Sequence, residues 1–168
     1  MLLKKLSLIS LLIVVIASSA SVGVARSESA QATTYPVSKV ISREALTKYK
    51  HVDVSVKEND KDVTYSGVPL RELLAEMVPE TKLDVMPGWK ELARKELVFE
   101  AKGTDGYPGL VTALEVAMNK DGTSYVLATE RESKPLEFNV QLICSHDQAH
   151  TRWVKDVVSL RVVSVSEK

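Results

Sequence analysis

Cysteine is nearly absent from this chain, because Cys144 is the only one among 168 residues. A single thiol cannot form a disulfide within the chain, so packing has to stabilise the fold. The formal net charge is +0, and no basic run interleaved with aromatic residues occurs, which gives nucleic-acid binding no support. The Gly-x-Ser-x-Gly sequence of a nucleophilic serine is also missing. The sequence therefore assigns no catalytic residue.

Long apolar runs are confined to the N-terminus. Lys4 and Lys5 precede an apolar stretch, 6–16, and small residues follow, with a cleavage site after Ala20 or Ala25. This is the layout of a secretory signal peptide, and the apolar run is shorter than the ~20 residues of a spanning helix. We expect residues 1–25 to be a signal peptide, 26–34 a flexible linker and 35–168 the folded domain. The alternative is an uncleaved anchor. Cleavage would place the domain in the periplasm or outside the cell, without membrane attachment.

A hairpin is predicted early in the domain. Residues 51–57 alternate between valines and polar side chains, and 58–62 has the composition of a turn. The partner strand is expected to run through Val63 and Tyr65 and to end at Gly67.

A short amphipathic helix is expected directly after this hairpin. Pro69 suits its first position, and Leu70, Leu73, Leu74 and Met77 fall on one face.

The rest of the domain reads as strands with brief helices between them. One strand is expected to place Phe138, Val140, Leu142 and Cys144 on a single face. Pro87-Gly88 is expected to form a turn. The other expected segments are strands at 36–40, 96–102, 110–112, 125–129 and 157–165, helices at 42–48, 89–94 and 113–119, and loops at 105–109 and 130–135. Because strands and helices do not alternate regularly, we predict an α+β fold with a mixed, mainly antiparallel sheet.

Four fragments, in this order, carry a family resemblance. They are Tyr-Ser-Gly-Val-Pro-Leu-Arg-Glu-Leu-Leu at 65–74, Asp-Gly-Tyr at 105–107, Leu-Ala at 127–128 with Pro-Leu at 135–136, and Arg-Trp-Val-Lys at 152–155 before the last strand. Together they resemble the molybdopterin-binding domain of the sulfite-oxidase family. The resemblance implies that family's fold, a molybdopterin cofactor and oxidoreductase activity. It also implies a cleft formed by the loops around Asn59, 105–107 and 145–152.

Two positions depart from the pattern of that family. Its enzymes carry a cysteine that binds molybdenum before the Gly-Val-Pro-Leu segment, whereas 52–66 contains none here. Molybdenum in this family needs a soft, anionic sulfur donor from the protein. Near 138–143 the family often has an arginine, which suits a pterin phosphate, and this chain has neutral Gln141.

Three functions remain open on these residues. The first is a molybdopterin-dependent redox enzyme. The second is a non-catalytic protein of the same fold that binds a small ligand, a metal or a partner protein. The third is a structural subunit with an empty pocket. The residues favour the second, since the expected metal ligand is missing.

The candidate site residues come from two loops. By resemblance, Asp105, Tyr107, His146 and Arg152 are the cofactor-binding candidates. Cys144, His146 and His150 are the metal candidates, because thiolate and imidazole bind zinc or copper. The alternatives are that Cys144 points into the core, that Trp153 is buried and that Arg152 pairs with a carboxylate. Tyr107 is expected either to line a pocket or to fix its own loop.

Overall fold

The computed structural model describes residues 35–165, which belong to one compact unit, Gln31–Lys168. The predicted signal peptide, 1–25, and the linker, 26–34, lie outside the described residues. Within 35–165 no helix is both long and apolar enough to cross a membrane. In chain order the elements are β1 (Val37–Val40), α1 (Arg43–Leu46), β2 (Val52–Glu58), β3 (Lys61–Pro69), α2 (Leu70–Met77), α3 (Met86–Arg94), β4 (Leu97–Gly103), β5 (Pro108–Thr112), α4 (Ala113–Met118), β6 (Tyr125–Arg131), β7 (Lys134–Pro135), β8 (Gln141–Cys144) and β9 (Val157–Ser164).

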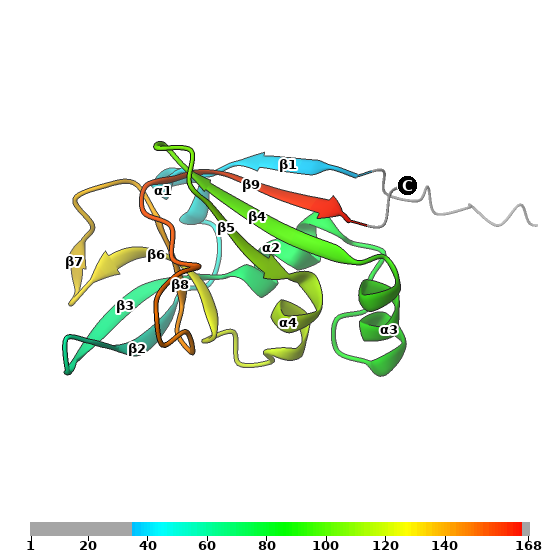
Figure 1. Ribbon diagram of the computed structural model, residues 1–168, viewed down its shortest axis with the longest axis horizontal. Coiled ribbons are helices and arrows are strands. Elements are labelled where there is room, and N and C mark those ends of the chain that lie inside the picture. The colour runs from blue at the N-terminus through cyan, green and yellow to red at the C-terminus, as the bar shows by residue number, and fades with distance from the viewer. Residues whose placement is uncertain (1–34, 166–168) are drawn as a thin grey trace, which may run out of the picture. The chain divides into compact units, whose positions relative to one another are not determined.

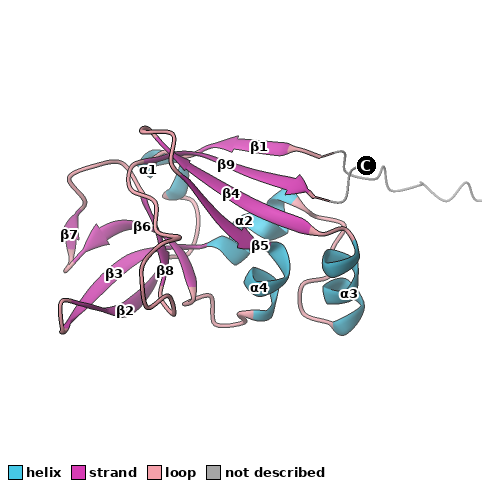
Figure 2. Cartoon of the chain, viewed as in Figure 1, coloured by secondary structure: helices cyan, strands magenta, loops and turns pink. Residues whose placement is uncertain are grey.

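The strands form two sheets. The first sheet has the order β1-β9-β4-β5, and the second has the order β2-β3-β6-β7 with β8 also paired to β6. Each pairing between these strands is antiparallel. Figure 1 shows helices α2 and α4 beside one face of the first sheet, with the second sheet next to them, and Figure 2 separates the short helices from the strands by colour. The predicted α+β class with a mainly antiparallel sheet is confirmed.

The larger core lies between the first sheet and the helices. Leu97, Phe99 and Ala101 of β4 are buried there, as the alternation in the sequence predicted. All four apolar residues of the α2 face, Leu70, Leu73, Leu74 and Met77, are buried in the same cluster. Truncating one such leucine to alanine costs about 2–5 kcal/mol, so these faces determine how the helix meets the sheet.

A smaller core covers one face of the second sheet. Its buried members are Val54, Val56, Val63, Tyr65, Val126, Ala128, Leu136 and Ile143, with Phe138 and Trp153 packed against them. The predicted hairpin supplies half of this cluster. Its turn, Asn59-Asp60, has φ values of 49° and 64°, the left-handed geometry of a two-residue turn that matches the twist of the strands.

The predicted end of the hairpin strand was wrong by two residues. Strand β3 continues past Gly67 to Pro69, where Gly67 pairs with Ala128 and Pro69 pairs with Val126. A Cβ atom at Gly67 would lie 2.2 Å from the carbonyl oxygen of Leu127, so glycine is required by close approach of two strands and not by a strand end. Pro69, which was predicted to be the first helical residue, is instead the last residue of β3 and the N-cap residue of α2, and Leu70 begins the helix.

Three other predictions of local structure were wrong. Pro87 and Gly88 lie inside α3, since proline is tolerated in the first turn of a helix. The expected loop at 130–135 contains the end of β6 and all of β7, joined by a turn with positive φ at Glu132 and Ser133. Phe138 precedes β8 and packs on the smaller core, whereas Val140, Leu142 and Cys144 face the larger one.

Candidate functional site

A cleft of about 820 Å³ opens beside the smaller core. It lies where three separated parts of the chain meet: the β2–β3 hairpin, the β4–β5 turn and the segments on both sides of β8. Its lining residues are Glu58, Asn59, Tyr65, Asp105, Tyr107, Arg131, Lys134, Pro135, Leu136, Glu137, Phe138, Gln141, His150, Trp153 and Lys155.

A row of cross-strand partners forms one side of the cleft. Tyr65 pairs with Arg131, and Arg131 pairs with Lys134, so the three side chains lie on the same face of the second sheet. The hydroxyl of Tyr65 donates to the Glu58 carboxylate at 2.5 Å, and Arg131 donates to it at 2.8 Å. Arg131 also lies 5.9 Å from the centre of the Tyr65 ring. These contacts fix the side chains of Glu58, Tyr65 and Arg131, which together form the polar row of the cleft, before any ligand arrives.

The same contacts set the ionisation of the row. Burial and the neighbouring Glu58 carboxylate raise the pKa of Tyr65 to about 12. Burial also opposes ionisation of Glu58, but hydrogen bonds from Tyr65 and Arg131 outweigh it and lower the pKa of that carboxyl. At neutral pH the row therefore presents a phenol, a carboxylate and a guanidinium that satisfy one another.

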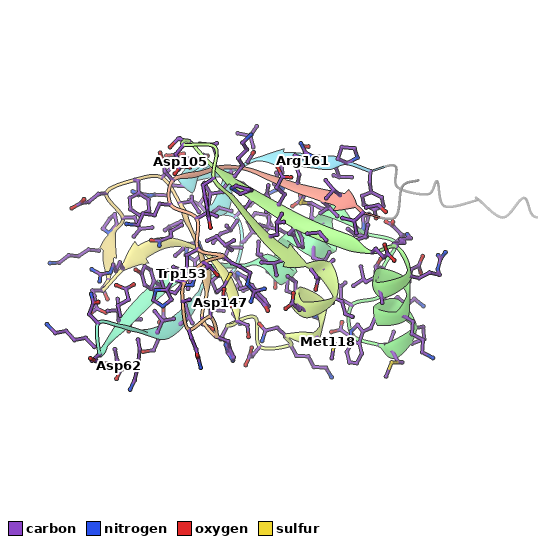
Figure 3. All side chains as sticks on the ribbon, viewed as in Figure 1. Asp62, Asp105, Met118, Asp147, Trp153 and Arg161 are labelled. Carbon is purple, nitrogen blue, oxygen red and sulfur yellow. The ribbon has the colours of Figure 1, made fainter. Side chains whose placement is uncertain are left out.

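Aromatic rings form the neighbouring wall. The ring of Trp153 lies 5.8 Å from that of Tyr65 in an edge-to-face arrangement, and His150 stacks on Trp153 at 3.9 Å. The indole N–H of Trp153 donates to the carbonyl oxygen of Cys144 at 2.9 Å, which fixes the ring against the end of β8. Figure 3 shows Trp153 between the second sheet and the segment that follows β8. This wall offers a flat, apolar surface with few free rotations.

The β4–β5 turn forms part of the rim. The carboxylate of Asp105 accepts from the backbone N–H of Tyr107 at 2.9 Å, and Gly106 between them has φ +83°, a value that favours glycine. The hydroxyl of Tyr107 donates to the carbonyl oxygen of Thr151 at 2.6 Å. Tyr107 thus lines the cleft and also ties the turn to the segment after β8.

One arginine helps to hold residues 136–138, which line another part of the cleft. Arg43 of α1 donates to the carbonyl oxygens of Leu136 and Phe138, both at 2.7 Å. Because a guanidinium presents several donors in a fixed plane, one side chain can hold an irregular segment in place.

The structure brings together only some of the predicted site residues. Asp105, Tyr107 and His150 line the cleft, as does Asn59 of the hairpin turn. His146 and Arg152 are not among the lining residues. The exposed side chain of His146 forms a 2.8 Å hydrogen bond with Ser145.

Arg152 faces away from the cleft and toward two carboxylates. Its Nε donates to Asp147 at 2.9 Å, and its Nη1 lies 3.5 Å from a carboxylate oxygen of Glu115. The guanidinium also lies 5.6 Å from the ring centre of Tyr125. These contacts give Arg152 a role in holding the segment between β8 and β9 on the fold.

Cys144, His146 and His150 do not converge. Cys144 has no exposed surface, and its Sγ lies 3.9 Å from the carbonyl oxygen of Arg152. Burial raises the pKa of this thiol to about 12. Among residues 35–165, no group of three or more His, Cys, Asp or Glu side chains is arranged to hold a metal ion.

The donor atoms of the cleft do not fit a molybdenum centre of the resembled kind. The lining residues offer carboxylate oxygens, hydroxyls, an imidazole and amides, but no sulfur. The only thiol of the chain is buried and protonated in the larger core. A molybdenum ion that needs a protein thiolate would therefore find none at this cleft.

Several cleft residues were missed by the sequence analysis. Glu58 was read as part of a turn, Arg131, Lys134 and Pro135 were read as loop, and Phe138 was placed in a strand. Asn59 and Asp60 form a two-residue hairpin turn. Predicting that short turn from the sequence would have placed Glu58 at the end of the first hairpin strand. The pairing of Tyr65 with Arg131 had no signal, because the strands are 66 positions apart and register between them depends on the folded sheet.

The cleft is thus identified from the residues of this chain alone. No protein-family model matches the chain, and no curated protein matches it either.

Proposed function

We propose that this protein is an exported, non-catalytic binding protein for a small organic molecule, built on a fold of the sulfite-oxidase type. The observation that carries the proposal is the cleft itself, which combines aromatic walls with hydrogen-bonding groups and contains no thiol. Its volume of about 820 Å³ lies in the range of pockets that enclose small organic ligands.

The position of the cleft supports the proposed fold. The resemblance implies a cleft between the loops around Asn59, 105–107 and 145–152. Asn59, Asp105, Tyr107 and His150, one or more from each loop, line the observed cleft.

The state of Cys144 favours binding over redox chemistry. One form of the oxidoreductase hypothesis needs this sulfur to reach a metal, yet it lies in the larger core with no exposed surface. A molybdopterin bound without a protein thiolate would have to rely on the oxygen and nitrogen donors of the cleft. We accordingly assign the cleft to binding and no residue to catalysis.

The two tryptophans provide a direct test. Trp153 lines the cleft, whereas Trp89 lies on α3, outside it, and donates to the carbonyl oxygen of Leu83 at 2.7 Å. In Trp89→Phe, the emission of Trp153 should change saturably when a planar ligand such as lumazine, 1,3-dimethyllumazine, nicotinamide or adenine binds. The matched variant Trp153→Phe keeps Trp89 and should show no saturable change.

Two results would contradict the binding proposal. One is that no compound in the panel changes the emission of Trp89→Phe or produces heat in calorimetry with the unmodified protein. That outcome would favour a structural subunit with an empty pocket. The other is an equal change in both single-tryptophan variants, which would place binding away from the cleft. Melting temperatures of both variants verify that they are folded.

The proposed export has its own test. Expression of the full chain in a bacterial host, followed by mass spectrometry of the periplasmic product, should give an N-terminus after Ala20 or Ala25. Recovery of only the uncleaved chain in the membrane fraction would favour the anchor instead.

A further inference from the structure

We propose that Gln141 selects a neutral, planar ligand that presents a lactam edge, an N–H beside a C=O, to the floor of the cleft. This inference rests on the proposed binding function and names the class of ligand for that same cleft.

The side chain of Gln141 is buried without a partner from the chain. It lines the cleft with only 4% of its surface exposed. Its amide makes no hydrogen bond to another residue of the described range 35–165. The amide atoms are not among the fully shielded polar atoms without a partner, so they keep contact with the space of the cleft. An amide left unpaired at the floor of a cleft is therefore available to a ligand.

The strand places this amide on the cleft side of the sheet. Leu142 and Cys144 of β8 face the larger core, so Gln141 and Ile143 face the smaller core and the cleft. The residue directly opposite Gln141 on β6 is Ala128. A methyl group there leaves the Gln141 amide uncovered.

The chemistry of the amide specifies the ligand edge. A glutamine side chain presents one carbonyl acceptor beside one N–H₂ donor. A lactam presents the complementary N–H and C=O on one edge of a ring, so both groups of the amide are satisfied by a single planar partner. Such a ring would lie beside the stacked pair His150 and Trp153, whose flat faces favour planar ligands.

The charge balance of the cleft indicates a neutral ligand. Three lining residues are acidic, Glu58, Asp105 and Glu137, and three are basic, Arg131, Lys134 and Lys155. Arg131 is already paired with Glu58. The formal charges of the lining residues therefore balance, which gives an anion no net attraction. The neutral amide of Gln141 complements a neutral ligand edge.

The test uses two probes that differ only at the lactam. Lumazine carries ring N–H groups beside carbonyl groups, whereas 1,3-dimethyllumazine has methyl groups in place of those N–H hydrogens. Calorimetry with the unmodified protein, at a pH where both probes are neutral, should give a Kd for lumazine at least about tenfold lower, the usual effect of losing a hydrogen bond in a buried site.

Variants then assign the effect to Gln141. In Gln141→Leu the Kd for lumazine should rise by about tenfold, and the Kd for 1,3-dimethyllumazine should change by less than about twofold. The matched control Gln148→Leu changes an exposed glutamine of the following loop, which does not line the cleft, and should leave both values unchanged. If Gln141→Leu fails to fold, the Kd values of the two probes on the unmodified protein still test whether the cleft selects a lactam edge.

The failures of the two proposals are distinguishable. Equal Kd values for the two probes, or equal losses for both in Gln141→Leu, would overturn the role of Gln141 and leave the binding function intact. Absence of binding by either probe and by the rest of the panel would overturn both.

Discussion

The thiol of Cys144 is predicted to be unreactive in the folded protein. The side chain has no exposed surface and belongs to the larger core, and its Sγ faces the carbonyl oxygen of Arg152 at 3.9 Å. A reagent can reach this sulfur only when β8 or the segment that covers it opens. Because the thiolate is the reactive form, the ionisation of the thiol sets a second limit on the rate.

The size of this second limit follows from the pKa. Burial raises the pKa of Cys144 to about 12. At a pH of about 8, on the order of one such thiol in ten thousand is ionised, against roughly a quarter of ordinary thiols. Alkylation of the folded protein should therefore be at least about a thousandfold slower than that of the unfolded chain, even before restricted access is counted.

Iodoacetamide and intact-mass spectrometry measure this directly. The folded protein and the same protein in a denaturing concentration of guanidinium are alkylated side by side, and Cys144→Ser serves as the blank. A folded-state rate within about tenfold of the unfolded rate would contradict the reasoning, because it would require an accessible or ionised thiol. Such a sulfur could serve a metal, and the oxidoreductase hypothesis would regain its missing ligand.

Three further predictions concern stability and the wall of the cleft. Gly67→Ala should lower the free energy of unfolding by more than about 3 kcal/mol, measured in urea, because its Cβ would meet backbone of the neighbouring strand at 2.2 Å. Gly106→Ala, whose Cβ would meet only the flexible side chain of Lys102 at 3.9 Å but whose φ is +83°, should cost only about 1 kcal/mol. Hydrogen bonds from Lys39 and Tyr49 lower the pKa of Glu76 to about 2. The contribution of this carboxylate to the free energy of unfolding should therefore be complete above its unfolded pKa of 4.5 and disappear as the pH falls toward 2. The difference in urea stability between the unmodified protein and Glu76→Gln should shrink over that range. Arg43→Ala should speed amide hydrogen exchange at 136–139, since it removes the donor that holds these carbonyl groups.

Each of these expectations has a clear contrary outcome. Equal decreases in the free energy of unfolding in Gly67→Ala and Gly106→Ala would mean that β3 and β6 leave room for a Cβ atom at position 67. A stability difference for Glu76→Gln that is independent of pH would show that the carboxylate charge contributes nothing. Unchanged exchange at 136–139 in Arg43→Ala, judged against the exposed control Arg94→Ala, would mean that the wall is held by other contacts.

Local patterns in the sequence predicted the elements that one face of a helix or strand defines. The Leu70 to Met77 face and the alternation through 97–101 were read correctly, because each buries its apolar side chains against a single core. The hairpin at 52–69 was found for the same reason. Its end was misplaced because glycine was taken as a strand end, whereas here it permits close approach of Leu127.

Features that depend on pairing between distant segments could not be predicted. Phe138 was predicted to share the strand face of Val140, because the alternation was extended back to it. Strand β8 begins only at Gln141, and the backbone carbonyl of Phe138 accepts a hydrogen bond from Arg43 instead of pairing in the sheet. Likewise, the short strand β7 has no signal of its own in two residues, Lys134 and Pro135, and forms because β6 is long enough to pair with it.

The candidate site was predicted in outline and not in chemistry. The resemblance implied which loops would meet, and Asp105, Tyr107 and His150 do line the cleft. The polar row of Glu58, Tyr65 and Arg131 could not be predicted from the sequence, because its residues come together only through the register between β3 and β6. Cys144 counted as a metal candidate by its neighbours in sequence, while its burial follows from the two-residue period of β8.

The molybdenum content of the purified protein tests the central claim most directly. The full chain, expressed with its own N-terminus in a host that makes molybdopterin, is purified and measured by inductively coupled plasma mass spectrometry. We predict far less than stoichiometric molybdenum, and the same value in Cys144→Ser. Stoichiometric molybdenum in the unmodified protein that is lost in Cys144→Ser would contradict the account, since it would show that the buried sulfur binds the metal.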